Sequence, residues 1–430
     1  MNLKYEPKKI FDVSKSQEMF KRALNVMPAG IYGHLGPSEG CMIPVQSYPL
    51  YMSRAEGAYV YDIDGNRIID YMCAYGPNFL GYNDPDVDAA AAEQRKKGDC
   101  TTLVSPISID FAEELVSTIN MADWAFFAKN GGDITQFSVM IARAYTHRKK
   151  IVLTKGYYHG VAPWMQKLGY SGVTEEDLAN NLYIDWNAPE QFEALCKKYP
   201  GQIAAFIATP YMHGNFLDNM IPVPGYWQKI RKICDDNGIV LIFDDVRAGF
   251  RVNIKGTDFE YGIKADLSCF CKALANGYNI SAICGAKKLL NATADIAYTG
   301  SYWFSAVPMA AGIATLKKAK AVNAVEENIK KGKKLTDGLA EVAKMNGFDL
   351  KVTGEPAMFY LRLANDYPST ILHQEWVAEC VKRGVFFTSH HNHFISYALS
   401  DADIQYTWEV ADEAYKVIRK NHPDYEGYIK

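Results

Sequence analysis

Short runs of β-branched and aromatic residues alternate along this chain with longer amphipathic stretches. That alternation is typical of a parallel β-sheet covered by helices. The apolar runs are nearly continuous, which indicates strands that are buried on both faces. The predicted strands span residues 124–128, 151–154, 204–208, 239–243, 267–270 and 282–284. The predicted helices span residues 134–145, 225–237, 308–319, 322–344 and 401–420.

The first 70 residues follow a different pattern. Residues 58–70 alternate in polarity across an Asp64-Gly65 turn, which predicts a β-hairpin. We therefore expect an N-terminal segment, residues 1–70, built from a helix and this hairpin and packed with a small C-terminal domain. Residues 71–315 would form a large α/β domain with a mostly parallel sheet, and residues 316–430 a smaller α+β domain. The 322–344 stretch is a candidate connection between these two domains.

Composition narrows the class of protein. The 430 residues are 48% hydrophobic and 22% charged, which is typical of a soluble globular chain with a large core. With 46 basic and 49 acidic residues, the net charge of −3 argues against nucleic acid as the main partner. No stretch of the sequence is apolar enough for a membrane span. Nine cysteines and a start without an apolar signal region favour a reduced, cytoplasmic location.

Chemically useful residues follow four of the predicted strands. The strand at 124–128 leads into Lys129-Asn-Gly-Gly-Asp133, and the strand at 151–154 leads into Gly156-Tyr-Tyr-His-Gly160. The next two are followed by Asp244-Asp245 and by Lys272. Ligands of an open parallel sheet bind outside the carboxyl ends of its strands. We therefore expect these four segments to meet at one site.

Each segment taken alone has two interpretations. The Gly131-Gly132 turn before a helix would offer N–H groups to a phosphate, or it is only a turn. Asp244 would hold a proton on a ring nitrogen, or it caps a helix. Lys272 would be a nucleophile that forms Schiff bases, or its ammonium reaches solvent from a strand end. Cys269 and Cys271 have no second Cys or His pair nearby, so buried thiols are favoured there over a metal site.

A phosphate cradle, a ring-stacking aromatic, an acid and a lysine together describe a site for pyridoxal 5′-phosphate (PLP). With these residues the chain resembles the class III, fold-type I PLP-dependent aminotransferases, in particular the glutamate-1-semialdehyde 2,1-aminomutase branch. The most specific match is Phe243-Asp-Asp-Val followed by Gly249-Phe-Arg251 and then by Lys272. Matching stretches occur in the family's order at residues 57–66, 75–81, 130–133, 141–146, 156–160, 241–252, 265–272 and 308–312.

The resemblance implies a role for each cofactor residue. Lys272 would form the internal aldimine and move the α-proton of the substrate, and Asp244 would keep the pyridine nitrogen protonated. Tyr158 would stack on one face of the ring and Val246 on the other, with His159 as a neighbour or as an ordinary structural histidine. The phosphate would bind at Gly131, Gly132 and Asp133 and at Ser301 of the partner subunit, because the family forms homodimers with active sites at the interface.

Several positions depart from the family pattern. The arginine that binds the substrate carboxylate in the aminomutases aligns with Gly36, and the usual Asn-Ser-Gly-Thr reads Asn130-Gly-Gly-Asp133. The Asp133 side chain must therefore turn away from a phosphate. The aminomutase's Glu-Ala-Gly-Phe aligns with residues 391–394, which contain histidines. A metal site there is disfavoured by the H-H-x-H spacing of residues 390–393. The candidate substrate residues are His34, Tyr75, Arg247, His391 and His393.

The leading hypothesis is therefore an aminotransferase that moves an amino group from an amino donor to a keto acid or aldehyde through PLP on Lys272. An isomerase on the same scaffold, either an aminomutase or an amino acid racemase, uses the same cofactor residues and stays open. A binding protein that kept the fold without its chemistry is a third hypothesis, and the presence of both Lys272 and Asp244 argues against it.

Overall fold

The computed structural model describes the whole chain except residues 1–2, 4–6, 32–46, 367–368 and 430. Its packing divides the chain into two compact units. Unit 1 contains Met1–Asp84, Asn215–Asp218 and Glu326–Lys430, and unit 2 contains Pro85–Gly214 and Asn219–Val325. The domain boundaries expected at residues 70 and 315 stay predictions. No helix among the described residues has both the length and the apolar character of a membrane span.

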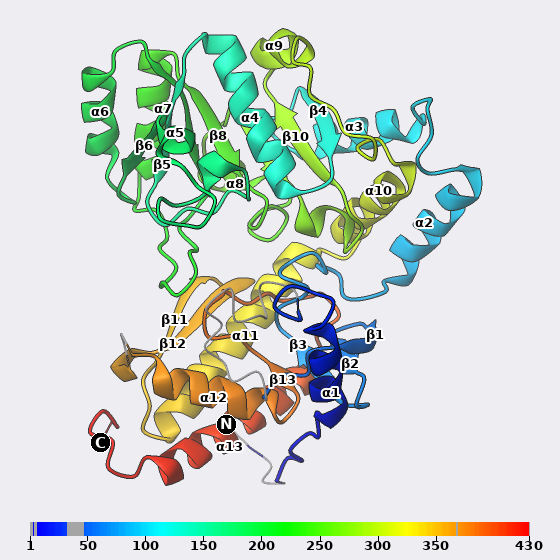
Figure 1. The fold of residues 1–430 in the computed structure, drawn as a ribbon, viewed down its shortest axis with the longest axis vertical. Helices are drawn as coiled ribbons and strands as arrows, with labels where there is room; N and C mark the ends of the chain where they lie inside the picture. The colour runs from blue at the N-terminus through cyan, green and yellow to red at the C-terminus, as the bar shows by residue number, and fades with distance from the viewer. Residues whose placement is uncertain (1–2, 4–6, 32–46, 367–368, 430) are drawn as a thin grey trace. The chain divides into compact units, whose positions relative to one another are not determined.

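Unit 2 is built on a seven-stranded sheet (Figure 1). Its order is β4 (Trp124–Ala128), β10 (Ser281–Gly285), β9 (Leu267–Phe270), β8 (Val240–Asp244), β7 (Ile203–Ala208), β5 (Lys150–Thr154) and β6 (Asn181–Ile184). Only β10 runs antiparallel to its neighbours. The predicted α/β fold with a mostly parallel sheet is confirmed.

All six predicted strands are present, with ends that differ by at most one residue. The edge strand β6 was missed. Its sequence, Asn181-Leu-Tyr-Ile184, is short, begins with a polar residue and exposes Tyr183, so it lacks the continuous apolar run that marked the other strands.

Helices pack on this sheet through apolar faces. The central helix is α4 (Gly131–Thr146), which lies against β7, β8, β9 and β10. Its Ile134, Phe137 and Ile141 join the strand residues Leu153 and Ile242 in one buried cluster. The other helices of unit 2 are α2 (Pro85–Lys97), α3 (Ile107–Thr118), α5 (Glu175–Leu178), α6 (Pro189–Lys198), α7 (Tyr226–Asn237), α8 (Thr257–Glu260), α9 (Leu290–Ala294) and α10 (Ala306–Ala321).

Unit 1 contains a four-stranded sheet in the order β1 (Met52–Glu56), β2 (Tyr59–Asp62), β3 (Arg67–Asp70) and β13 (Val385–Phe386). β2 and β3 form the predicted hairpin, and Gly65 in its turn has a φ of +91° that suits glycine. A second hairpin joins β11 (Leu350–Glu355) to β12 (Met358–Leu363). The helices are α1 (Ser14–Ala23), α11 (Ala324–Met345), α12 (Ile371–Val381) and α13 (Asp401–Asn421).

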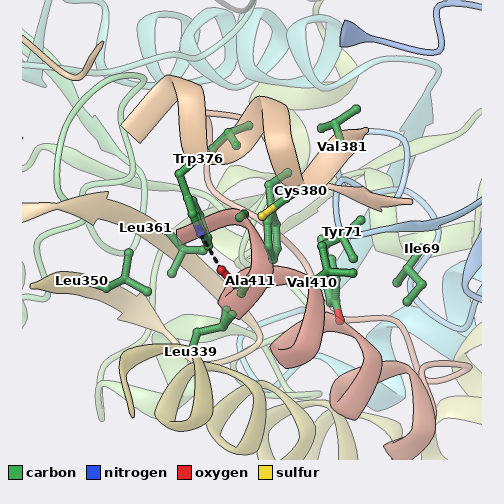
Figure 2. Packing of buried hydrophobic residues seen from close by; sticks show 14 of the residues in the cluster. Ile69, Tyr71, Leu339, Leu350, Leu361, Trp376, Cys380, Val381, Val410 and Ala411 are labelled. Atoms are coloured by element: carbon green, nitrogen blue, oxygen red, sulfur yellow. Dashed lines mark hydrogen bonds between the residues drawn. The ribbon is translucent and has the colours of Figure 1, made fainter. Parts of the chain in front are cut away.

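The core of unit 1 forms where α11, α12 and α13 meet the β11–β12 hairpin (Figure 2). Trp376 of α12 is fully buried there, and its indole N–H donates to the carbonyl of Ala411 in α13. Leu339 of α11 and Leu361 of β12 fill the space around it. The predicted connection at 322–344 is α11, whose first two residues belong to unit 2 and whose remainder belongs to unit 1.

Candidate active site

The predicted cofactor segments follow the carboxyl ends of β4, β5, β8 and β9, and all four strands belong to the sheet of unit 2. β8 and β9 are neighbours, and Asp244, the last residue of β8, is paired with Cys269 of β9. Lys272 follows three residues later, in the 3₁₀ turn Lys272–Ala275. The register of two adjacent strands therefore sets the acid and the lysine at the same edge of the sheet.

Asp244 is held by two hydrogen bonds. One oxygen accepts a bond from the backbone N–H of Val246 at 3.1 Å, and the other lies 2.6 Å from Nδ1 of His159. Asp244 and His159 are only 3% and 2% exposed. The helix-cap interpretation of Asp244 is wrong, since a turn rather than a helix follows it.

Lys272 has an unusual backbone and an unusual amine. Its φ is +46°, in the left-handed region that non-glycine residues rarely adopt and that is often found at functional sites. Burial lowers the pKa of its amine to about 7, and the neighbouring cation Arg247 acts in the same direction. A large fraction of these amines is therefore neutral near neutral pH, as a nucleophile requires.

The expected anion site would lie at the first turn of α4. The Asp133 side chain turns back and accepts bonds from the backbone N–H groups of Lys129 at 3.2 Å and Asn130 at 2.8 Å. The predicted reorientation of Asp133 is therefore present. Helix N-termini attract phosphate through their first N–H groups and the positive end of the helix dipole.

Gly160 packs against the glycines at the start of α4, and we call Gly131, Gly132 and Gly160 together the glycine cradle. Gly160 has a φ of +131°, and a Cβ there would lie 2.7 Å from Cα of Gly132 and 2.9 Å from Sδ of Met165. Thr135 of α4 donates its hydroxyl to the carbonyl of His159 at 2.6 Å. The 156–160 loop is therefore attached directly to the start of α4.

The two predicted ring-stacking residues flank this region. Tyr158, in the same loop, is 51% exposed. Val246 packs on the start of α4, because a Cβ on Gly131 would lie 2.7 Å from its Cγ1. Their stacking roles stay predictions.

The remaining candidates fall into three groups. Ser301 lies beside Cys100 in unit 2, with its carbonyl accepting a bond from the Cys100 thiol. Tyr75 and His391 belong to unit 1, and their rings meet edge to face at 5.3 Å. His393, also in unit 1, stacks on Phe359. His34 lies outside the described residues.

The described part of the chain contains no candidate metal site. No group of three or more His, Cys, Asp or Glu side chains there is arranged to hold an ion. The Cys269 and Cys271 thiols instead contact the carbonyls of Ile134 and Lys129, respectively.

Three residues of the site were missed from the sequence: Thr135, Gly160 and His213. Gly160 is the last residue of the segment 156–160, which was singled out for Tyr158 and His159. Thr135 lies two positions past the segment 129–133. His213 lies five residues past the end of β7, and its carbonyl accepts a bond from Arg247. The residues directly after β7, Thr209 and Pro210, gave no signal that pointed to it.

Comparison with known proteins gives the family. The profile of the class-III aminotransferases matches residues 42–409. The chain is 40% identical to the aminopentol aminotransferase of Sphingopyxis macrogoltabida, covering 95% of each chain. The chain belongs to the class-III aminotransferases.

Two further relatives support this assignment. The glutamate-1-semialdehyde 2,1-aminomutase of Francisella philomiragia is 32% identical, over 91% of this chain and 96% of the relative. The structure of the PLP internal aldimine form of the FumI protein of Sphingopyxis sp. MTA144 superposes with a TM-score of 0.92 at 39% identity. It covers 96% of this chain and 99% of that one. The predicted family and its cofactor, PLP, are confirmed, and the protein is an aminotransferase.

The residues of this aminotransferase fit PLP. The cofactor needs an amine, an acid for its pyridine nitrogen and donors for its phosphate. Unit 2 provides the amine of Lys272, the fixed carboxylate of Asp244 and the glycine-lined start of α4. Adding a methyl group at Gly160 would push directly into that cradle.

Gly160→Ala should therefore weaken PLP binding while the sheet stays folded. The backbone strain and the 2.7 Å clash predict a loss of about 1–3 kcal/mol, which corresponds to about 5–150-fold in affinity. Titration of the apoprotein with PLP measures this. Gly169→Ala is the matched control, because Gly169 also has a positive φ, +93°, but its Cβ would have no neighbour within 4 Å. Equal losses in both variants would contradict a cradle at Gly160.

The lowered pKa of Lys272 makes a second prediction. For a pKa of about 7, the neutral fraction of the amine rises about tenfold between pH 6 and pH 8 and then levels off. Labelling of the apoprotein with an amine-reactive reagent, read by peptide mass spectrometry, should follow that curve at Lys272. Lys232 is the internal control, because Asp236 raises its pKa, and its labelling should keep rising. A Lys272 profile without a plateau would contradict the lowered pKa.

Proposed function

We propose that Lys272 and Asp244 are the catalytic residues of this aminotransferase and that the cradle of Gly131, Gly132 and Gly160 holds the cofactor phosphate. The observation that carries the proposal is the placement of Asp244 and Lys272 at the ends of two adjacent strands. When bound, PLP serves as an electron sink for charge that develops at the amino-bearing carbon. The protein must hold it, orient it and move one proton.

Each protein group has one task in this proposal. The Nζ atom of Lys272 carries the cofactor and moves the proton of the substrate's amino-bearing carbon. Asp244 keeps a proton on the pyridine nitrogen. His159 fixes the carboxylate through its 2.6 Å bond, and Thr135 fixes His159 through its carbonyl. Tyr158 and Val246 cover the ring faces, and Tyr75, Arg247, His391 and His393 remain candidates for substrate contact.

We further propose a donor whose amino-bearing carbon has no carboxylate, and a keto acid as acceptor. The donor class is supported by the 40% identity to an aminopentol aminotransferase and by Gly36 at the position of the carboxylate-binding arginine. Over the two half-reactions, the donor carbon loses its amino group and one hydrogen and gains an oxygen. The acceptor carbon loses its oxygen and gains the amino group and one hydrogen. An amine and a keto acid become a carbonyl compound and an amino acid, with no external oxidant or reductant.

Variants of the two catalytic residues test the chemistry. Lys272→Ala should bind PLP but lose turnover by about 100–10,000-fold, because its proton transfer is lost. Asp244→Asn should keep the fold and lose most activity. Asp245→Asn is the control: the Asp245 oxygens accept bonds from the N–H and the hydroxyl of Thr257, and an amide can accept from the N–H with its oxygen while its NH2 donates to the hydroxyl oxygen. Near-normal rates for Lys272→Ala, or isomerisation of one amino compound without a keto acid, would contradict the proposal.

We also propose a cytoplasmic homodimer in which Ser301 reaches the partner's phosphate. Three apolar side chains close together in the sequence, Leu103, Val104 and Ile109, are strongly exposed on unit 2. Exposed apolar groups of this kind often mark interfaces. The same segment reaches Ser301 through Cys100. The eight cysteines in the described part of the chain are all free thiols, which suits a reducing compartment.

Ile109→Glu should therefore shift the protein toward monomer and lower its affinity for PLP. Sedimentation velocity measures the mass, and cofactor titration measures the affinity. The control is Ile371→Glu in unit 1, because Ile109 and Ile371 are both 63% exposed. A dimer of unchanged stability in Ile109→Glu, or a monomeric wild type, would contradict the proposed interface.

A further inference from the structure

Three stacked rings lead from the edge strand of the large sheet to the proposed acid. The centroids of the Tyr157 and His159 rings are 5.4 Å apart, and the ring planes are inclined by 17°. The ring of Tyr157 also stacks with Tyr183 of β6, at 6.0 Å and 19°. Both separations are typical of offset-stacked rings. Because His159 is bonded to Asp244, this aromatic stack of Tyr183, Tyr157 and His159 ends at the carboxylate proposed for the pyridine nitrogen.

The ring of His159 needs a restraint besides its hydrogen bond. Its Nδ1 lies 2.6 Å from the Asp244 carboxylate, whereas its Nε2 has no hydrogen-bond partner among the described residues. The bond from Thr135 fixes the main chain of His159 and not its ring. A ring that is bonded at one atom can still turn about that bond. The face of Tyr157 opposes this rotation, because a turned ring would lose the stacking contact.

Tyr157 is itself fixed within the loop that follows β5. Its hydroxyl donates to the carbonyl of Gln166 at 2.9 Å, and the Gln166 amide donates to the carbonyl of Gly160 at 3.0 Å. The loop is therefore closed on itself between residues 157 and 166. Burial raises the pKa of the Tyr157 phenol, and Tyr183 acts in the same direction. The phenol stays neutral at physiological pH, so its effect on His159 is one of position rather than of charge.

We propose that Tyr157 is a positioning residue that holds the ring of His159 in the plane in which it directs Asp244 at the pyridine nitrogen of the cofactor. The inference rests on the proposed function of Asp244 and deepens it, since Tyr157 acts through His159. A carboxylate that is placed less well holds the proton of the nitrogen less firmly. Because a positive charge on the ring makes other protonated groups of the cofactor more acidic, weaker protonation raises the pH at which the cofactor's visible band changes.

Replacement of the Tyr157 ring tests this position. In Tyr157→Leu the visible band of the bound cofactor should change at a pH about 0.4–1 unit higher than in the wild type, as expected for the loss of one aromatic contact. Tyr157→Phe keeps the ring and loses only the bond to Gln166. It should therefore shift the band by less than half as much.

A second measurement uses the apoprotein and needs no cofactor. Diethyl pyrocarbonate modifies accessible imidazole nitrogens, and peptide mass spectrometry follows the reaction of each histidine. His159 is 2% exposed, so it should react slowly in the wild type and about 2–10-fold faster in Tyr157→Leu, where its ring can turn. His147, exposed at the end of α4, is the internal reference and should react equally in both proteins.

Tyr199→Leu is the matched control. Tyr199 is also a partly exposed tyrosine of unit 2, but its ring lies near the ammonium groups of Lys150 and Lys198, at the amino end of β5. This substitution should lower the melting temperature without moving the band or speeding the labelling of His159. If Tyr157→Leu behaves like Tyr199→Leu, the ring is only structural and the inference is overturned. A shift in Tyr157→Phe as large as that in Tyr157→Leu also overturns it.

Asp244→Asn separates this inference from the proposed function. It should raise the same pH by more than Tyr157→Leu does, because the acid itself is replaced. An unchanged band in Asp244→Asn would contradict the proposed role of Asp244. The labelling of His159 in the apoprotein would still decide whether Tyr157 holds its ring.

Discussion

The bond between His159 and Asp244 is the interaction on which the site depends. Both side chains are buried, so neither could remain unpaired without a cost of about 1–3 kcal/mol or more. The bond joins the loop after β5 to the end of β8, and the carbonyl of His159 continues the connection to Thr135 in α4. Three segments that are distant in the sequence are therefore fixed by two short hydrogen bonds.

The site also stores backbone strain, which the sheet beneath it must support. Lys272 has a φ of +46°, which a residue with a side chain adopts only at a cost, whereas Gly160 reaches +131° freely because it has no Cβ. Positions of this kind persist only where the surrounding packing determines them. β7, β8 and β9 are buried along their whole length and provide that rigid base. A fixed base is what a site needs to hold its groups in a reactive geometry.

The sequence predicted the sheet because strands buried on both faces leave continuous apolar runs, and it predicted Asp244 and Lys272 because strand ends converge in a parallel sheet. It could not predict that Asp244 bonds His159, because that contact depends on the rotation of two side chains 85 residues apart. The close approach of Gly160 to Gly132 also depends on the path of a loop, for which no periodic pattern exists. The orientation of the Asp133 side chain, in contrast, could be predicted. A carboxylate beside a phosphate must turn away, and the N–H groups that it accepts from lie within four residues in the sequence.

Two hydrogen bonds fix Asp244 at the edge of the sheet that also holds Lys272. A carboxylate free to pair with Lys272 would favour the ammonium form and raise the pKa of the amine. Instead, one oxygen of Asp244 is occupied by His159 and the other by the N–H of Val246. Burial and Arg247 then dominate the environment of Lys272, and its pKa falls to about 7. Burial and the neighbouring arginine therefore keep the amine reactive although an acid lies at the same edge of the sheet.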